Sequence, residues 1–276
     1  MIRTSLQRAA AVLTRRHRSV LMSYPGLRMG NVLYFALQAG IRRKAGEDFR
    51  ILESGSGAGW LEAFPSLNPY MLPSSQLRFS DRRVGLPPLF FQEWGIDFTQ
   101  ADLESFIQSA ILSAPAWREW REGCGLRGEG VTINVRRGDY YSNPDFRKVY
   151  GFDVERYVHR VIDHIRDERG QLGPVNVVSD DPQWCRQHLN WLSNQSSSLT
   201  FMGPESGVLS NFFSIAASRT LLITNSTFSY WASYVSNEIY GDNRSQVWVP
   251  SLHSRAVRDG RPWQHDPAWR AIDVEV

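Results

Sequence analysis

The stretch Asn134-Val135-Arg136-Arg137-Gly138-Asp139-Tyr140 directly follows an apolar run at residues 131–133. Together they predict a buried strand at 131–135, because short apolar runs bounded by turn residues are typical of strands covered on both faces. Side chains alternate between the two faces of a strand, so Arg136 and Arg137 should point in opposite directions. One of these arginines is therefore expected to face the carboxyl end of the sheet, where open α/β sheets bind their ligands.

The rest of the chain alternates between strand and helix patterns. Strands are predicted at 19–23, 49–53, 131–135, 175–178, 199–202 and 220–224. Helices are predicted at 32–39, 102–113, 154–169, 182–189 and 209–218, and from residue 230 onward. This alternation indicates an α/β fold with parallel sheets covered by helices.

A glycine-dense segment at 123–130 is the expected boundary between two domains. It divides the chain into an N-terminal domain at 1–128, with a basic leader at 1–18, and a second domain at 129–250. Residues 251–276 are predicted to form a C-terminal tail. Its histidines, His253 and His265, lack the spacing of a zinc site and are predicted to lie on the surface.

Composition excludes little. The formal net charge of +3 and the pI of about 9.0 are too mild to indicate nucleic acid as a partner. No acidic residue precedes Glu47, so residues 6–13 could form a basic helix on an acidic membrane surface; a solvated leader is the alternative. With no secretory signal, no membrane-spanning run and two cysteines, the expected location is cytoplasmic, with peripheral contact at the cytoplasmic membrane face left open.

Three polar clusters stand at predicted strand ends: residues 134–140, Ser179-Asp180-Asp181-Pro182 and Asn225-Ser226-Thr227-Phe228-Ser229. Parallel neighbouring strands would place them along one edge of a sheet. They combine guanidinium groups, carboxylates and hydroxyls beside a predicted helix start. Helix starts and arginines both bind phosphate well, so the clusters predict a phosphorylated small-molecule ligand.

Each cluster also has a structural interpretation. Arg137 and Asp139 could form an ordinary ion pair, and serine or threonine after a strand often only caps a helix. Asp181 is expected to be such a cap. Asp180 and Asp181 could instead hold Mn²⁺ or Mg²⁺ at a diphosphate, although that chemistry favours a spaced Asp-x-Asp.

In this order, the clusters resemble the motifs of the α-1,2-fucosyltransferase family, whose hallmark reads His-x-Arg-Arg-Gly-Asp-Tyr. Residues 178–185 are similar to the family's Ser-Asp-Asp segment, and 225–231 to its Asn-Ser-(Ser/Thr)-Phe-Ser-Trp run. Residues 26–31 are more loosely similar to its Gly-Asn-Gln segment. The resemblance spans about residues 20–250 and departs at two positions, where Asn134 replaces the hallmark histidine and Val32 replaces a glutamine.

The resemblance implies two Rossmann-like domains facing each other across a cleft, an arrangement called GT-B-like. It also implies transfer of fucose from GDP-fucose to a glycan hydroxyl, O2 of a galactose, with inversion and without metal or cofactor. Two alternatives stay open: a non-catalytic sugar-nucleotide-binding protein, and a metal-dependent glycosyltransferase that uses another nucleotide sugar. The oligomeric state has no signature in the sequence.

The same resemblance assigns roles to residues of this chain. Arg136, ranked above Arg137, would meet the diphosphate, and Asp139 would orient the arginine. Asp139 and Asp145 are the candidates for the general base. Further residues expected to bind the donor are Asn134, Asp180, Asn225, Ser226, Thr227 and Phe228 of the second domain, together with Gly30 and Asn31 of the N-terminal domain, which would form the acceptor side of the cleft.

Overall fold

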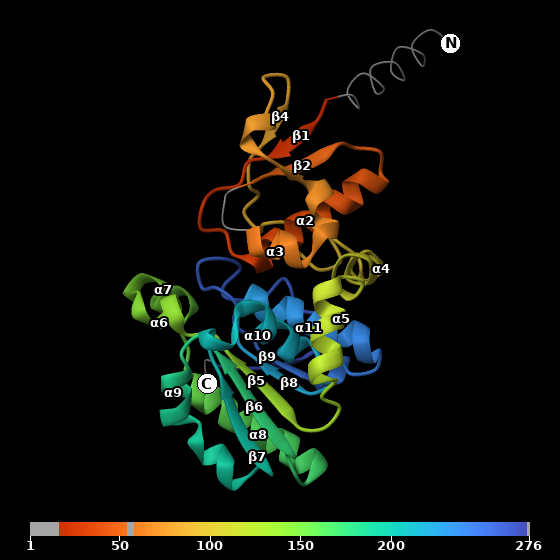
Figure 1. Cartoon of the computed structure of the whole chain (residues 1–276). Coiled ribbons are helices and arrows are strands. Elements are labelled where there is room, and N and C mark those ends of the chain that lie inside the picture. Colours follow the sequence, from red (N-terminus) through yellow and green to blue (C-terminus); the bar gives the residue numbers. More distant parts are fainter. Residues whose placement is uncertain (1–16, 54–57, 275–276) are drawn as a thin grey trace, which may run out of the picture. The chain divides into compact units, whose positions relative to one another are not determined.

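The chain folds into two α/β units, each built on a parallel sheet (Figure 1). The structure is a computed structural model that describes residues 17–53 and 58–274. The units comprise residues 1–117 and 118–276, so the division falls inside helix α5 (Pro115–Cys124) rather than at residue 128. The reason lies in the packing of α5 on the second unit: the Trp120 ring lies 5.8 Å from that of Phe213, and its indole N–H donates to Ser210.

Unit 1 contains a four-stranded sheet in the order β3-β2-β1-β4. Its strands are β1 (Ser19–Leu21), β2 (Phe49–Leu52), β3 (Met71–Leu72) and β4 (Arg82–Val84). Its helices are α2 (Met29–Lys44), α3 (Ala58–Ala63), α4 (Gln100–Phe106) and the π-helix η3 (Ile107–Leu112), with short 3-10 turns at Pro65–Tyr70 and Ser74–Gln76. The predicted strands at 19–23 and 49–53 are confirmed, and the predicted helix at 102–113 is an α-helix that continues as a π-helix.

Unit 2 contains a six-stranded parallel sheet in the order β10-β9-β8-β5-β6-β7. Its strands are β5 (Val131–Val135), β6 (Pro174–Ser179), β7 (Ser198–Met202), β8 (Leu221–Ile223), β9 (Val247–Pro250) and β10 (Arg270–Ile272). Its helices after α5 are α6 (Gly138–Ser142), α7 (Pro144–Tyr150), α8 (Val154–Arg169), α9 (Pro182–His188), α10 (Val208–Ala216) and α11 (Thr227–Tyr240). The α/β class with parallel sheets covered by helices is confirmed.

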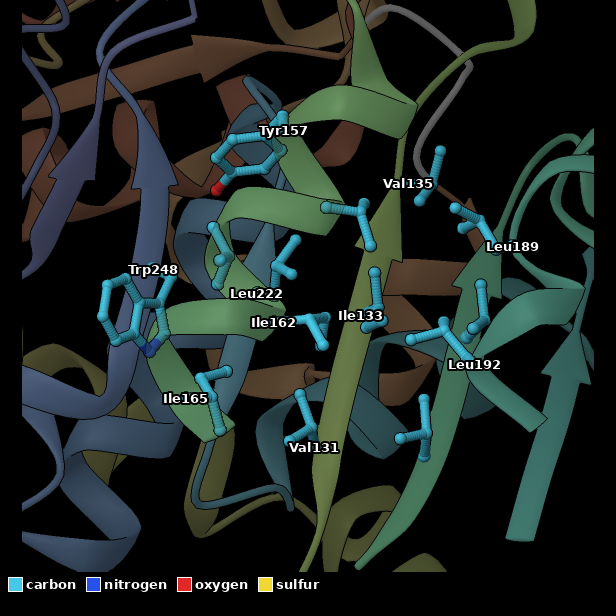
Figure 2. Close-up of a cluster of buried hydrophobic side chains, with 14 of the residues drawn as sticks. Val131, Ile133, Val135, Tyr157, Ile162, Ile165, Leu189, Leu192, Leu222 and Trp248 are labelled. Atoms are coloured by element: carbon cyan, nitrogen blue, oxygen red, sulfur yellow. The ribbon is translucent and has the colours of Figure 1, made fainter. Parts of the chain in front are cut away.

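One face of β5 belongs to the hydrophobic core. Val131, Ile133 and Val135 lie in one cluster with buried side chains of α8 such as Ile162 and Ile165 (Figure 2), and each is at most 2% exposed. Helix α8 matches this face because its apolar residues recur at helical spacing: Val154, Tyr157, Val158, Val161, Ile162 and Ile165. This packing fixes the odd-numbered side of β5 and leaves the even-numbered side for the opposite face.

That opposite face is polar. Thr132 shares a hydrogen bond of 2.7 Å with Ser218, and Asn134 bonds to Ser229 of α11. Asn176, on β6, donates to Ser214 of α10 at 3.2 Å. Buried polar groups are tolerated when each finds a partner, so these bonds fix the register between the sheet and the helices α10 and α11.

Residues 251–274 form part of unit 2 instead of a separate tail, because β10 extends its sheet beside β9. The prediction that the histidines of this segment lie on the surface is wrong for His253, which is 7% exposed and packs its ring 4.7 Å from that of Trp263. Asn225 Nδ2 donates to the His253 carbonyl at 2.9 Å. Buried aromatic side chains of this segment, Trp263 and Trp269, provide apolar surface for packing. Their positions in the sequence follow neither the helix nor the strand period, so the packing was not predicted.

The predicted leader at 1–18 lies outside the described residues except for His17 and Arg18. Within the described part of the chain, every helix is too short or too polar to cross a bilayer.

Candidate functional site

The two adjacent arginines go to opposite sides of the sheet, as the strand alternation predicts. Arg136 follows Thr132 and Asn134 on the α11 side, and its backbone N–H donates to Thr224 Oγ1 at 2.8 Å. Its guanidinium pairs with Asp139 and, at 2.7 Å, with Asp180. The side chain is 28% exposed, so the charge is held by two acids yet remains open to solvent at the carboxyl edge of β5.

Arg137 is enclosed on the other side. Its guanidinium lies 4.0 Å from the Tyr141 ring centre and 3.9 Å from that of Trp184, and its Nε reaches Asp181 at 3.3 Å. The predicted pairing of Arg137 with Asp139 is therefore wrong: Asp139 pairs with Arg136. A guanidinium that lies close to two aromatic rings and an acid is held by packing and charge, so Arg137 is a packing residue beside the site.

Asp180 clamps the turn that carries both arginines. Its Oδ1 accepts the backbone N–H of Arg137 at 2.8 Å, while Oδ2 pairs with Arg136. The same Oδ2 would lie 2.4 Å from a Cβ at position 138, so only glycine leaves room for the carboxylate. Asp180, which directly follows the neighbouring strand β6, thus holds Arg136 in place. Gly138 leaves the room that the Asp180 carboxylate needs.

The N-terminus of α11 lies at the same edge and on the same face as Arg136. Helix α11 follows β8, the direct neighbour of β5. Its N-cap residue, Ser226, makes no side-chain capping bond, its first turn holds no acidic residue, and Thr227 and Phe228 are partly exposed. The free N–H groups of a helix start carry partial positive charge, so this end of α11 and the Arg136 guanidinium are two positive groups at one edge of the sheet.

Asn134 and Asn225, two of the residues expected to contact a donor, are buried and form hydrogen bonds within unit 2. Asn134 is 6% exposed and uses both ends of its amide, donating to Val178 O at 2.9 Å and accepting from Ser229. Asn225 is 1% exposed and donates to the carbonyls of Tyr150 and His253. Asn134 therefore has both ends of its amide occupied, and the Asn225 amide nitrogen joins two other segments of unit 2.

Asp145 is exposed to solvent, and the N-terminal pair belongs to unit 1. The Asp145 side chain is 87% exposed on α7, where it pairs with Lys148 at 3.5 Å. Gly30 and Asn31 belong to the first turn of α2 in unit 1, and Asn31 accepts a hydrogen bond of 2.9 Å from Gln92. Of the expected site residues in unit 2, the structure joins Arg136, Asp139 and Asp180, and places Ser226 and Thr227 at the start of α11 at the same edge of the sheet.

An aromatic stack continues from Arg136. Its guanidinium lies 5.3 Å from the Tyr140 ring, which stacks on Tyr150 with ring centres 4.4 Å apart. Burial is the main cause that raises the pKa of Tyr140, so its hydroxyl stays protonated at neutral pH. The stack forms a flat wall beside the guanidinium.

A cavity of 510 Å³ opens on the Arg137 side of the same edge. It is lined by Arg137, Tyr141, Arg147, Gly151, Phe152, Asp153, Val154, Glu155, Trp184 and His188. Within it, His188 Nδ1 lies 2.8 Å from Glu155 Oε2, and the His188 ring stacks on Trp184. The cavity therefore contains both charges and aromatic rings that already pair with one another.

Two contributors were absent from the sequence predictions. Thr224 supports Arg136 through its hydroxyl, and Trp184 packs on Arg137. The signal for Trp184 was its place directly after the Asp-Asp-Pro turn, and that for Thr224 its place one residue before the third cluster. Among residues 17–53 and 58–274, no group of three or more His, Cys, Asp or Glu side chains is arranged to hold a metal.

Comparison with known proteins finds relatives that are named as glycosyltransferases. The chain is 29% identical over 107 residues to an alpha-1,2-colitosyltransferase of Escherichia coli, covering 39% of this chain and 36% of the relative. It is 29% identical over 126 residues to a galactoside 2-alpha-L-fucosyltransferase of Caenorhabditis elegans, covering 44% of this chain and 32% of the relative. The matches thus span about a third of the length of these relatives.

Among solved structures, ADP-heptose LPS heptosyltransferase II of E. coli matches with a TM-score of 0.47 and 15% identity, covering 92% of this chain and 90% of that one. The family match is the more extensive sequence signal, because residues 91–240 match glycosyl transferase family 11. That segment is more than half of the chain and contains all three polar clusters. The chain belongs to glycosyl transferase family 11.

Proposed function

We propose that this chain transfers fucose from GDP-fucose to O2 of a galactose in a glycan, with inversion and without metal. The observation that carries the proposal is the pair of positive groups at the carboxyl edge of the sheet in unit 2. There Asp180 holds the Arg136 guanidinium, Thr224 accepts the Arg136 backbone N–H, and the uncapped start of α11 lies at the same edge. Relatives named for transfer of colitose and of fucose support a deoxy-sugar donor.

In the proposed reaction, the acceptor oxygen forms a bond to the anomeric carbon while the bond from that carbon to the diphosphate oxygen breaks. Negative charge then grows on the departing diphosphate. Arg136 and the N–H groups at the start of α11 would stabilise this charge, since fixed cations and dipoles lower the barrier where charge develops. The acceptor loses its proton to a base, and we assign that role to Asp139, which contacts Arg136, rather than to the exposed Asp145.

Arg136→Ala tests the proposal. We expect it to weaken GDP binding in calorimetry and to lower transfer from GDP-fucose by about a hundredfold or more, the scale of losing one strong transition-state contact. Arg219→Ala is the matched control, because Arg219 follows α10 at the opposite edge of the sheet and pairs with Asp242. Transfer in the presence of excess chelator should equal transfer without it.

Several outcomes would decide against parts of the proposal. An Arg136→Ala enzyme with the turnover of the parent removes the diphosphate assignment. Chelator-sensitive transfer favours a metal-dependent reaction, and tighter binding of UDP than of GDP changes the donor. Saturable GDP binding without transfer to any galactoside indicates a sugar-nucleotide-binding protein without catalysis.

A further inference from the structure

Unit 1 carries an exposed phenylalanine at the amino edge of its sheet. Phe79 lies in the loop before β4 and is 104% exposed, which means that no neighbouring atom shields the ring. Burial of an aromatic ring that is fully exposed to water would be favourable, because apolar surface would be removed from water. Single exposed apolar residues are common, so the surroundings of the ring decide whether it has a role.

Those surroundings are basic. Arg78 precedes Phe79 in the same loop, and Arg82 and Arg83 follow at the start of β4; all three are exposed. In the described part of the chain, neither Arg82 nor Arg83 is joined to an acid. Asp81, the carboxylate within the loop, is buried and occupied by Arg18 at 2.6 Å. The Arg18 guanidinium, through its hydrogen bond, lowers the pKa of this carboxyl, so its charge is fixed and locally balanced.

The neighbouring loops add to the same edge. Strands β1, β2 and β4 run parallel, so the loops that enter them lie at one edge of the sheet. Arg50 of β2 pairs with Asp48 at 2.6 Å, and this pair is the next charge along the edge. Among the described residues of this loop, Arg82 and Arg83 are therefore the arginines without an acidic partner, while Arg78 lies beside Asp81.

We propose that this loop, Arg78–Arg83, docks unit 1 on a membrane surface that contains anionic phospholipids. Phe79 would enter the interfacial region of the bilayer, and the three exposed arginines would lie at the level of the phosphates. An apolar side chain combined with several cations is the arrangement that gives reversible interfacial binding, since neither contribution is sufficient alone.

The docking loop is compatible with ligand binding by unit 1. It lies at the amino edge of the sheet, whereas the turn between β1 and α2 that carries Gly30 and Asn31 lies at the carboxyl edge. A membrane at the amino edge would leave that turn uncovered. The proposal does not rest on the proposed transferase activity, because it concerns a different surface and a different partner.

Sedimentation of the full chain with vesicles tests the inference. Vesicles of phosphatidylcholine are compared with vesicles of equal parts phosphatidylcholine and phosphatidylglycerol, and the parent should bind only the second. Phe79→Ser should lower the partition coefficient about tenfold, from the lost burial of the ring. Arg82→Gln with Arg83→Gln should lower it about twenty-fivefold, at about fivefold for each cation, and the Lys–Lys variant should bind like the parent.

Ile96→Ser provides the matched control. Ile96 is also exposed, at 74%, but its turn contains the acidic residues Glu93 and Asp97. This variant should bind the anionic vesicles like the parent. Equal binding by the parent, Phe79→Ser and the double-glutamine variant overturns the proposal, as does equal binding of the parent to both vesicle types. Parent protein that ignores vesicles but self-associates through Phe79 would identify a second copy of the chain as the partner instead.

Discussion

Gly138 determines how closely Asp180 can approach the turn between β5 and α6. A methyl group at this position would meet Asp180 Oδ2 at 2.4 Å, so the carboxylate or the turn must move. We expect Gly138→Ala to lower the free energy of unfolding by about 1–3 kcal/mol, the usual cost of overpacking. Because Asp180 holds Arg136, GDP binding should weaken as well. Urea denaturation and calorimetry with GDP measure the two effects.

Gly123→Ala is the control for Gly138→Ala. A Cβ at Gly123 meets no atom within 4 Å, so this substitution should leave both the free energy of unfolding and GDP binding close to those of the parent. If Gly138→Ala is as stable as Gly123→Ala and binds GDP equally well, Asp180 does not fix the turn.

For single residues, the sequence predicted the direction of the arginine side chains correctly, but it did not predict the partners of Asn134. The alternation of Arg136 and Arg137 follows from strand geometry and is confirmed by their separate partners. Asn134 was expected to meet a ligand, but its amide bonds to Val178 and Ser229, residues 44 and 95 positions away. Such partners depend on the packing of β5 against β6 and α11, which a local pattern does not contain.

Asp181 serves two elements at once, which allows its contributions to be separated. Its Oδ1 accepts the N–H of Trp184 at 3.2 Å as the N-cap of α9, and its Oδ2 pairs with Arg137. Asp181→Asn retains an acceptor for the cap and loses the charge, and its expected cost is at most about 1 kcal/mol because the pair is partly exposed. Asp181→Ala loses the cap too and should cost about 1 kcal/mol more.

Thermal unfolding of the two Asp181 variants compares these costs. Both should bind GDP like the parent, because Arg137 and Asp181 lie on the opposite side of β5 from Arg136. If the asparagine variant is as destabilised as the alanine variant, the ion pair rather than the cap stabilises α9.

At the element scale, strong periodicity decided which elements could be predicted. The helix at 154–169 was predicted with the bounds that α8 has, because its apolar residues follow helical spacing without interruption. Helices α6 and α7 were missed: they are short, largely polar, and separated by Asn143, which caps α7. Strands β9 and β10 lie among prolines and aromatics, and only pairing in the sheet gives them an extended form.

At the scale of the whole molecule, residues 251–274 complete unit 2 and make its stability depend on pH. Burial lowers the pKa of His253 and of His265 to about 3, from an ordinary value near 6.5. His253 packs beside Tyr230, whose hydroxyl lies 3.0 Å from its Nδ1, and the His265 ring lies 5.0 Å from the Tyr230 ring. Both histidines are therefore neutral in the folded protein over the whole range above that pKa.

The sign of the pH dependence follows from linkage. Between about pH 6.5 and pH 3 the unfolded chain binds protons that the folded chain excludes, so stability is full above this window and falls as the pH decreases through it. Each histidine should lower the free energy of unfolding by about 2 kcal/mol between about pH 7 and pH 5. His265→Phe retains an aromatic ring and removes one titrating group, so we expect it to abolish about half of this loss. Urea denaturation at the two pH values measures the loss, with His159→Phe at an exposed position as the control. If His265→Phe loses as much stability as the parent on acidification, the neutral state of buried His265 does not cause the pH dependence of unit 2.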